Sequence, residues 1–153
     1  KRHGASVELH VFGGVCAAFE QSQLASGIEL RGYVRDLAAA YADVDIVATP
    51  IEYGGGLNIK NVEALCHGRP LITSSHGAEG LEQGCSSAFW TAGDDLDFVQ
   101  KLERLLSDAA LRETLGESAV AFARRVLNHE KTYEALTKLL EAWPKVRSQR
   151  KDT

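Results

Sequence analysis

"DIVATPIEYGGGLNIKNVEALCHGRPLITSS", residues 45–75, joins two apolar runs through three glycines and a segment with helical spacing. The run at 45–50 predicts a β-strand, and "PLITSS" at 70–75 predicts a second one. Between them, apolar residues recur three or four apart over 57–67, which predicts a helix that ends at Gly68. Strands that alternate with helices of about ten residues form crossover units, so the two strands are expected to lie parallel in one sheet.

The rest of the chain continues this alternation as far as residue 94. Further strands are expected over 7–14, 28–34 and 87–92, and further helices over 16–26 and behind an Asp36 cap. After residue 94 only helical spacing remains, in three apolar stripes interpreted as core, the last of them Tyr133, Leu136, Leu140 and Trp143. We therefore predict an α/β fold over residues 1–143, a Rossmann-like parallel sheet sandwiched by helices with C-terminal helices, followed by a polar tail at 144–153.

Composition and charge exclude several classes of function. The 153 residues are 44% hydrophobic and 25% charged with a net charge of -4, which fits one globular domain with an adequate core. No run approaches the roughly 18 apolar residues of a membrane span, so a cytoplasmic location is expected. Lysine and arginine are spread along the chain, so no nucleic-acid partner is expected. No methionine occurs and the first residue is lysine, which favours a piece of a longer protein.

The cysteines give no disulfide framework and no metal site. Cys16, Cys66 and Cys85 are odd in number and far apart, without a CxxC pair, which favours reduced thiols in a cytosol. The adjacent pair Cys66-His67 cannot face one metal ion from a helix, and no second pair has ligand spacing. The cysteines therefore predict neither a disulfide nor a zinc site.

The glycines at 54–56 lie where a ligand is expected. In parallel α/β sheets, ligands bind beyond the carboxyl ends of the strands, where loops lead into helix N-termini. A helix N-terminus carries unpaired N–H groups and roughly half a positive charge, so it favours an anion such as phosphate. Lys60 and Glu63 lie on the helix face in line with Gly56, where a lysine can neutralise phosphate oxygens and a carboxylate can accept hydrogen bonds from sugar hydroxyls. The alternative is a plain glycine-rich turn with Lys60 and Glu63 as a solvated pair.

Other motifs that bind nucleotides or metals are absent or read as structural. No GxxxxGK[ST] occurs, and "FGGVCA" at 12–17 does not match GxGxxG, which disfavours ATP hydrolysis and NAD binding. Of two DxD pairs, Asp43-Asp45 precedes a strand and Asp95-Asp97 opens a helix, where carboxylates cap N–H groups. Both pairs are interpreted as structural. His67 and His76 flank the predicted strand at 70–75 and are candidates for the rim of a pocket.

Four blocks of the chain follow a recognisable order: "VELHVFGG" (7–14), "IELRGYVRDLAAAYADVDIVATP" (28–50), "GGGLNIKNVEALCHGRPLITSSHGAEGL" (54–81) and "LLSDAALRETLGESAVAFARR" (105–125). This order resembles the C-terminal, donor-binding domain of family 4 glycosyltransferases of the GT-B fold. The likeness covers about residues 7–143, and the third block is its most specific part. In that family the domain binds a nucleotide sugar, a second Rossmann-like domain on the N-terminal side holds the acceptor, and no metal is required.

The resemblance implies roles for two glycines and two residues near the ends of the first strands. Gly13 and Gly14 would let the backbone approach the donor phosphates, and Tyr33 and Val34 would pack against the nucleotide base. Without the resemblance, the glycines are interpreted as a simple chain turn and Tyr33 as a half-buried strand aromatic.

The same resemblance assigns the third block to the donor diphosphate and sugar. Gly55, Gly56 and Leu57 would contact the pyrophosphate and sugar through their backbone. Lys60 would lie near the phosphates and Glu63 would take the ribose hydroxyls, and these two residues are the expected catalytic pair. The chain departs from the family at Gly55, where many members carry a second glutamate.

The family's C-terminal domain usually begins with a further strand and helix, which carry an arginine and a lysine for the leaving diphosphate. Both are missing here, and the missing strand would lie in the middle of the sheet, so a gap or a different strand pairing is expected.

The function implied for the full-length protein is transfer of a glycosyl group from a nucleotide diphosphate sugar to an acceptor, with retained configuration and without a metal, in glycan biosynthesis. Its expected partners are the nucleotide-sugar donor and an acceptor-binding domain of the same protein. A peripheral contact with a membrane, made by the full-length protein, is a further possible partner. The isolated fragment is expected to be inactive. The alternative is a non-catalytic nucleotide-binding domain or a receiver-like signalling module, although the third predicted strand ends in Thr49-Pro50 and lacks the aspartate that a receiver needs.

Overall fold

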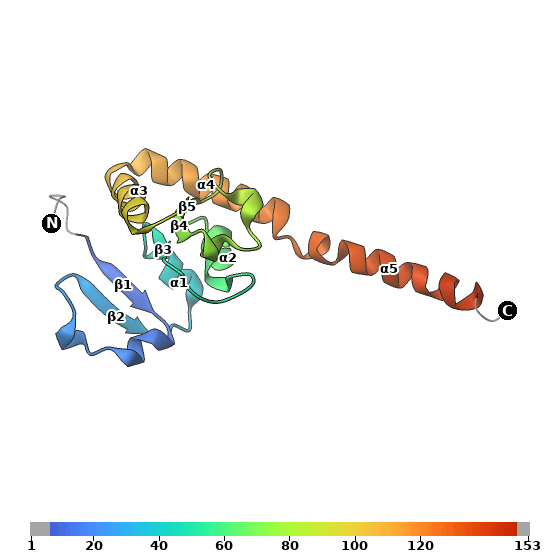
Figure 1. The fold of residues 1–153 in the computed structure, drawn as a ribbon, viewed down its shortest axis with the longest axis horizontal. Helices are drawn as coiled ribbons and strands as arrows, with labels where there is room; N and C mark the ends of the chain where they lie inside the picture. Colours follow the sequence, from blue (N-terminus) through green and yellow to red (C-terminus); the bar gives the residue numbers. More distant parts are fainter. Residues whose placement is uncertain (1–6, 150–153) are drawn as a thin grey trace. The chain divides into compact units, whose positions relative to one another are not determined.

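The computed structural model describes residues 7–149, and every strand pair in this part of the chain is parallel. The chain divides into two compact units, the first ending at Asp43 and the second beginning at Val44 (Figure 1). The described strands form two separate hydrogen-bonded sheets, β1-β2 and β3-β4-β5. β2 and β3 therefore belong to different sheets, one in each unit.

The first unit is built on two short strands. β1 (Leu9–Phe12) pairs with β2 (Ile28–Gly32), and α1 (Leu37–Ala42) follows. The predicted cap is confirmed, because the Asp36 side chain accepts a hydrogen bond from Ala39 N at 3.0 Å.

The α-helix predicted over 16–26 is wrong. The chain forms two short 3₁₀ turns instead, Gly14–Ala18 and Gln21–Gln23, separated by the extended Phe19. Gln21 explains the difference: its side chain donates to Ile28 O at 2.6 Å and accepts from Leu30 N at 3.0 Å. These bonds fasten the second turn to the backbone of β2, far along the chain from Gln21.

The second unit confirms the strand–helix–strand unit predicted over residues 45–75. β3 (Val47–Thr49), α2 (Ile59–Cys66) and β4 (Leu71–Ser74) follow one another, and β5 (Trp90–Ala92) pairs with β4 on the other side. Two short 3₁₀ turns, His76–Ala78 and Glu82–Gly84, connect β4 to β5. The unit continues with α3 (Asp95–Ser107) and α4 (Ala109–Val126).

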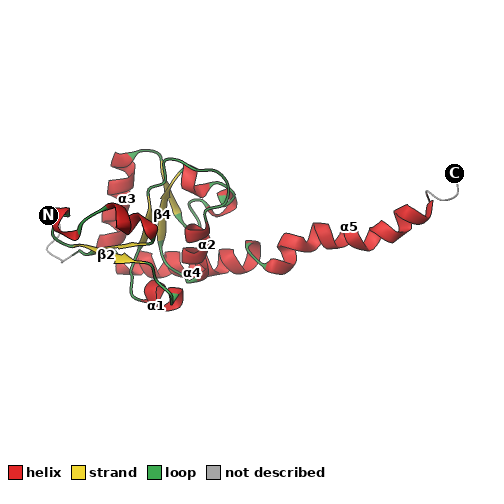
Figure 2. Cartoon of the chain, turned by 90° about the horizontal axis from the view of Figure 1, so that it is seen from below, coloured by secondary structure: helices red, strands yellow, loops and turns green. Residues whose placement is uncertain are grey.

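The helices cover both faces of this sheet (Figure 2). Successive residues of a strand point to opposite faces. Ile72 of β4 packs with Leu105 of α3 and Leu115 of α4 in a buried cluster, whereas the next residue, Thr73, bonds to Asn61 of α2. α2 and α3 therefore lie on opposite faces of β4, as the Rossmann-like prediction requires.

Two glycines set how closely α2 approaches α4. Gly68 ends α2 with a left-handed φ of +64°, as predicted, and a Cβ there would lie 2.8 Å from Val120 Cγ2. A Cβ on Gly116 would lie 2.5 Å from Gly68 O. Any larger residue at either position would push the two helices apart, because atoms in a packed interior have no room to move.

The last helix differs from its prediction. α5 (His129–Gln149) continues past Pro144, so the segment predicted as a polar tail begins in helix, while residues 150–153 lie outside the described part. Its arginine, lysine and glutamine residues favour helix. The interpretation of its apolar stripe as core is wrong for this chain, because its large apolar side chains are 48% to 61% exposed: Tyr133, Leu136, Leu139, Leu140 and Trp143. None of the described helices has the length and apolarity needed to cross a bilayer.

Candidate functional site

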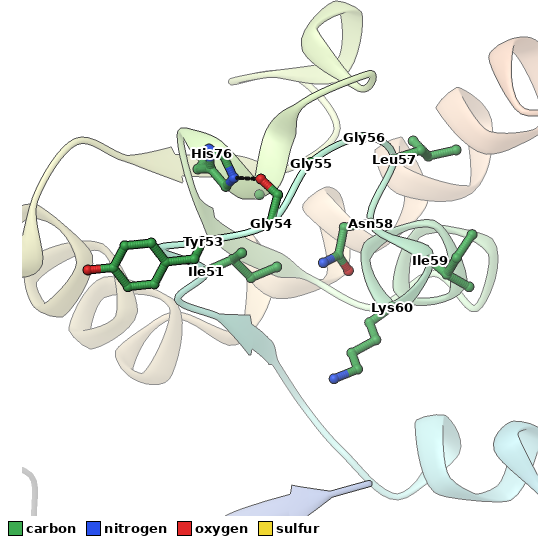
Figure 3. Close-up of a pocket in the computed structure, with 11 residues that line it drawn as sticks. Ile51, Tyr53, Gly54, Gly55, Gly56, Leu57, Asn58, Ile59, Lys60 and His76 are labelled. Atoms are coloured by element: carbon green, nitrogen blue, oxygen red, sulfur yellow. Dashed lines mark hydrogen bonds between the residues drawn. The ribbon is translucent and has the colours of Figure 1, made fainter. Parts of the chain in front are cut away.

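A cavity of about 230 Å³ opens at the carboxyl ends of β3 and β4 (Figure 3). Ile51 lies two residues beyond the end of β3, and His76 and Gly77 lie two and three residues beyond the end of β4. The remaining lining residues form one continuous stretch that runs into the first turn of α2: Tyr53, Gly54, Gly55, Gly56, Leu57, Asn58, Ile59 and Lys60. The cavity therefore lies where loops leave a parallel sheet and enter a helix, the usual ligand position in α/β folds.

The three glycines leave this part of the cavity wall without side chains. Gly54 and Gly56 have left-handed φ values of +133° and +79°, which other residues adopt only with strain. A Cβ on any of the three would meet no atom within 4 Å. The Cβ positions of all three glycines therefore face open space, where a ligand could approach the backbone.

Two side chains from the segment after β4 hold this turn. His76 Nε2 contacts Gly54 O, and because a carbonyl oxygen only accepts, Nε2 carries the hydrogen in this contact. On the other side of Gly55, Gly56 N donates to Glu79 Oε2 at 3.1 Å. The turn is therefore fastened on both sides by residues about 22 positions further along the chain.

A buried polar network forms the floor below the cavity. The Asn61 side chain accepts from Thr49 Oγ1 at 2.7 Å and donates to Gly77 O at 2.7 Å and to Thr73 Oγ1 at 3.2 Å. Asn61 and Thr73 have no exposed surface. Beside this network, Ser74 Oγ donates to Ile51 O at 2.5 Å and accepts from Gly77 N at 3.0 Å. These bonds join α2 to the ends of β3 and β4 and so fix the N-terminus of α2 at the cavity.

The sequence profile described as glycosyl transferases group 1 matches residues 1–108, more than half of the chain. The chain belongs to this family. Among solved structures, the crystal structure of Anabaena Alr3699/HepE in complex with UDP aligns with a TM-score of 0.75 at 14% sequence identity, over 89% of this chain and 41% of that one. No curated protein matches the sequence.

The likeness to HepE confirms the predicted fold, an α/β arrangement of parallel sheets with flanking helices that corresponds to one half of a GT-B glycosyltransferase. The chain spans less than half the length of HepE. Membership in this family disfavours the receiver-like alternative.

The structure places four of the predicted site residues at the cavity. Gly55, Gly56, Leu57 and Lys60 line it. In Figure 3 the exposed Lys60 side chain extends from the first turn of α2 away from the glycine turn. The lysine side chain is flexible, and its contact with a phosphate at the turn stays a prediction.

Glu63 lies one turn further along α2 and is half-buried. Glu63 is not among the residues that line the cavity, but its negative charge acts on the neighbouring Cys66. Burial, and next the charge of Glu63, raise the pKa of the Cys66 thiol. The role of Glu63 toward a ribose stays a prediction.

The other predicted residues belong to the first unit. Gly13 has a left-handed φ of +99° and donates from its N–H to Gly32 O at 2.7 Å, and Gly14 begins the following 3₁₀ turn. Tyr33 follows the end of β2 and is 86% exposed, so its interpretation as a half-buried strand aromatic is wrong. Val34 beside it is half-buried. Their contacts with a nucleotide stay predictions.

Sequence reasoning missed several residues of this site. Of the two histidines proposed for a pocket rim, His76 lines the cavity and His67 does not. Tyr53, 87% exposed at the cavity, and Glu79 were not singled out. The position of Tyr53 directly before the glycines was an available signal, whereas Glu79 reaches the turn only through the fold.

Proposed function

We propose that this chain is the nucleotide-sugar-binding domain of a family 4 glycosyltransferase, which moves a glycosyl group from a nucleotide diphosphate sugar to an acceptor with retained configuration and without a metal ion. The observation that carries the proposal is the open glycine turn, which leads into the N-terminus of α2 at the carboxyl edge of the sheet. The similar HepE structure contains UDP, which supports a nucleoside diphosphate as the leaving group.

The geometry suits a diphosphate for physical reasons. Backbone N–H groups and the positive end of the helix dipole favour an anion at the start of α2. Gly55 has no side chain to hold the anion away, and its Cβ position faces open space. Lys60, in the first turn of the helix, lines the cavity and carries a positive charge on a flexible side chain, which would turn toward the bound diphosphate. The pyrophosphate is assigned to the backbone of Gly55, Gly56 and Leu57.

Transfer requires that the departing diphosphate be stabilised while the acceptor is held in line. Charge that develops on a leaving group is lowered in energy by groups already oriented toward it, and Lys60 would supply part of that stabilisation. The acceptor is assigned to a further domain, because the chain spans only 41% of HepE. The isolated chain is therefore expected to bind nucleotide without turning over.

Titration of the full-length protein with UDP, GDP and ADP sugars tests the proposal, followed by a transfer assay with and without EDTA. Lys60→Ala should lower turnover strongly and leave the circular dichroism spectrum unchanged. Lys138→Ala is the control, because this exposed lysine pairs with Glu134 outside the cavity. Binding without transfer would favour a non-catalytic domain, and unchanged turnover in Lys60→Ala would remove its assigned role.

A further inference from the structure

A carboxylate already occupies one of the N–H groups that the glycine turn offers. Gly56 N donates to Glu79 Oε2 at 3.1 Å, within ordinary hydrogen-bond distance. Gly56 lines the cavity, and Glu79 is exposed just after the 3₁₀ turn His76–Ala78. A carboxylate oxygen is the same kind of acceptor as a phosphate oxygen, negatively charged and without a hydrogen to donate.

We propose that Glu79 occupies the anion position of the glycine turn when no ligand is bound, and that an incoming phosphate group displaces it. Glu79 thereby sets the affinity of the site for anions. This inference rests on the proposed function, because it assigns the displacing group to the diphosphate of the donor.

The two anions cannot share this N–H group. A backbone N–H makes one strong hydrogen bond, so the phosphate gains the bond to Gly56 only when Glu79 gives it up. Two negative charges held a few ångströms apart also repel each other, which adds to the cost of binding while Glu79 stays close. The affinity for a diphosphate is therefore lower than it would be if Glu79 did not occupy the turn.

The histidine on the other side of the turn does not compete with an incoming phosphate. His76 donates to Gly54 O, and a phosphate oxygen, which also accepts, does not compete for that bond. When Glu79 leaves, the turn is still held at Gly54, so the shape that receives the anion is retained. His76 thus supports the shape of the turn, whereas Glu79 occupies its hydrogen-bond donor, the N–H of Gly56.

Glu79→Gln tests the inference because glutamine keeps the shape and an acceptor oxygen but removes the charge. Glu82→Gln is a matched control: Glu82 Oε1 accepts from Gly80 N at 2.8 Å, and neither residue lines the cavity. Isothermal titration of the full-length protein would use UDP, inorganic pyrophosphate and uridine. We expect Glu79→Gln to bind UDP and pyrophosphate about tenfold more tightly, because a charged hydrogen bond no longer has to be broken.

Uridine affinity should be the same in all three proteins, because it carries no phosphate. If the unmodified protein binds UDP and Glu79→Gln binds it equally or more weakly, the inference is overturned and the proposed function stands. If neither protein binds pyrophosphate or any of UDP, GDP and ADP, the proposed function and the inference both fail.

Discussion

Asn61 Nδ2 donates a hydrogen bond to Thr73 Oγ1 at 3.2 Å, and neither residue has any exposed surface. Thr73 Oγ1 in turn donates to Thr49 O at 3.0 Å. The hydrogen bonds that begin at the Asn61 amide therefore connect α2 to β3 and to β4. Gly77 O, the third partner of Asn61, belongs to a residue that lines the cavity. The helix that presents Lys60 is thus held to the sheet by a buried polar network in addition to its buried apolar residues Ala64 and Leu65.

Replacing Asn61 should destabilise the fold. Asn61→Leu keeps the approximate volume but leaves Gly77 O and Thr49 Oγ1 buried or half-buried without their partner. Unsatisfied buried groups cost about 1–3 kcal/mol each, so we expect the free energy of unfolding in urea to fall by about 2–4 kcal/mol. Asn58→Ser, which keeps a capping oxygen at the start of α2, should change it by less than about 1 kcal/mol. A loss below about 1 kcal/mol in Asn61→Leu would show that the network does not hold α2.

The close approach of Gly77 to the same network predicts a steric effect. A Cβ on Gly77 would lie 2.1 Å from Thr73 Oγ1, a distance that no pair of atoms sustains. Gly77→Ala should therefore lower the free energy of unfolding by about 1–3 kcal/mol through forced displacement of the threonine. Gly93→Ala is the control, because an added Cβ there meets no atom within 4 Å.

A second substitution separates this steric cause from a change in backbone freedom. Thr73→Ala removes the oxygen that the new methyl group would strike, so the double variant Gly77→Ala/Thr73→Ala should lose less stability than the sum of the two single losses. Additive losses in urea denaturation would locate the effect of Gly77→Ala elsewhere.

The sequence predicted those parts of the fold whose signals are local. α2 was expected from its apolar spacing, its Gly68 end and the strands on either side, all within residues 45–75. The helix expected over 16–26 failed because Gln21 bonds to residues seven and nine positions away. The burial of Asn61 depends on Thr49, Thr73 and Gly77, which are 12 to 16 positions distant, so no local pattern indicated it. Glu79 escaped prediction for the same reason.

The charge of Glu63 should be measurable through its neighbour Cys66. Burial raises the pKa of the Cys66 thiol first, and the negative charge of Glu63 raises it further. Only the thiolate is alkylated, so Glu63→Gln should lower this pKa and speed the reaction of Cys66 with iodoacetamide. The increase should be less than about tenfold, because the glutamate is the smaller of the two causes. The midpoint of the rate against pH should move to lower pH.

Cys85 provides the control within the same molecule. Burial and the charge of Glu82 raise the pKa of its thiol, and Glu63 is not among the causes. Its alkylation rate, followed by mass spectrometry of the separate peptides, should therefore be unchanged in Glu63→Gln. Equal acceleration of both cysteines would indicate a general loosening of the fold. An unchanged rate at Cys66 would mean that the Glu63 carboxylate lies too far from the thiol to act on it.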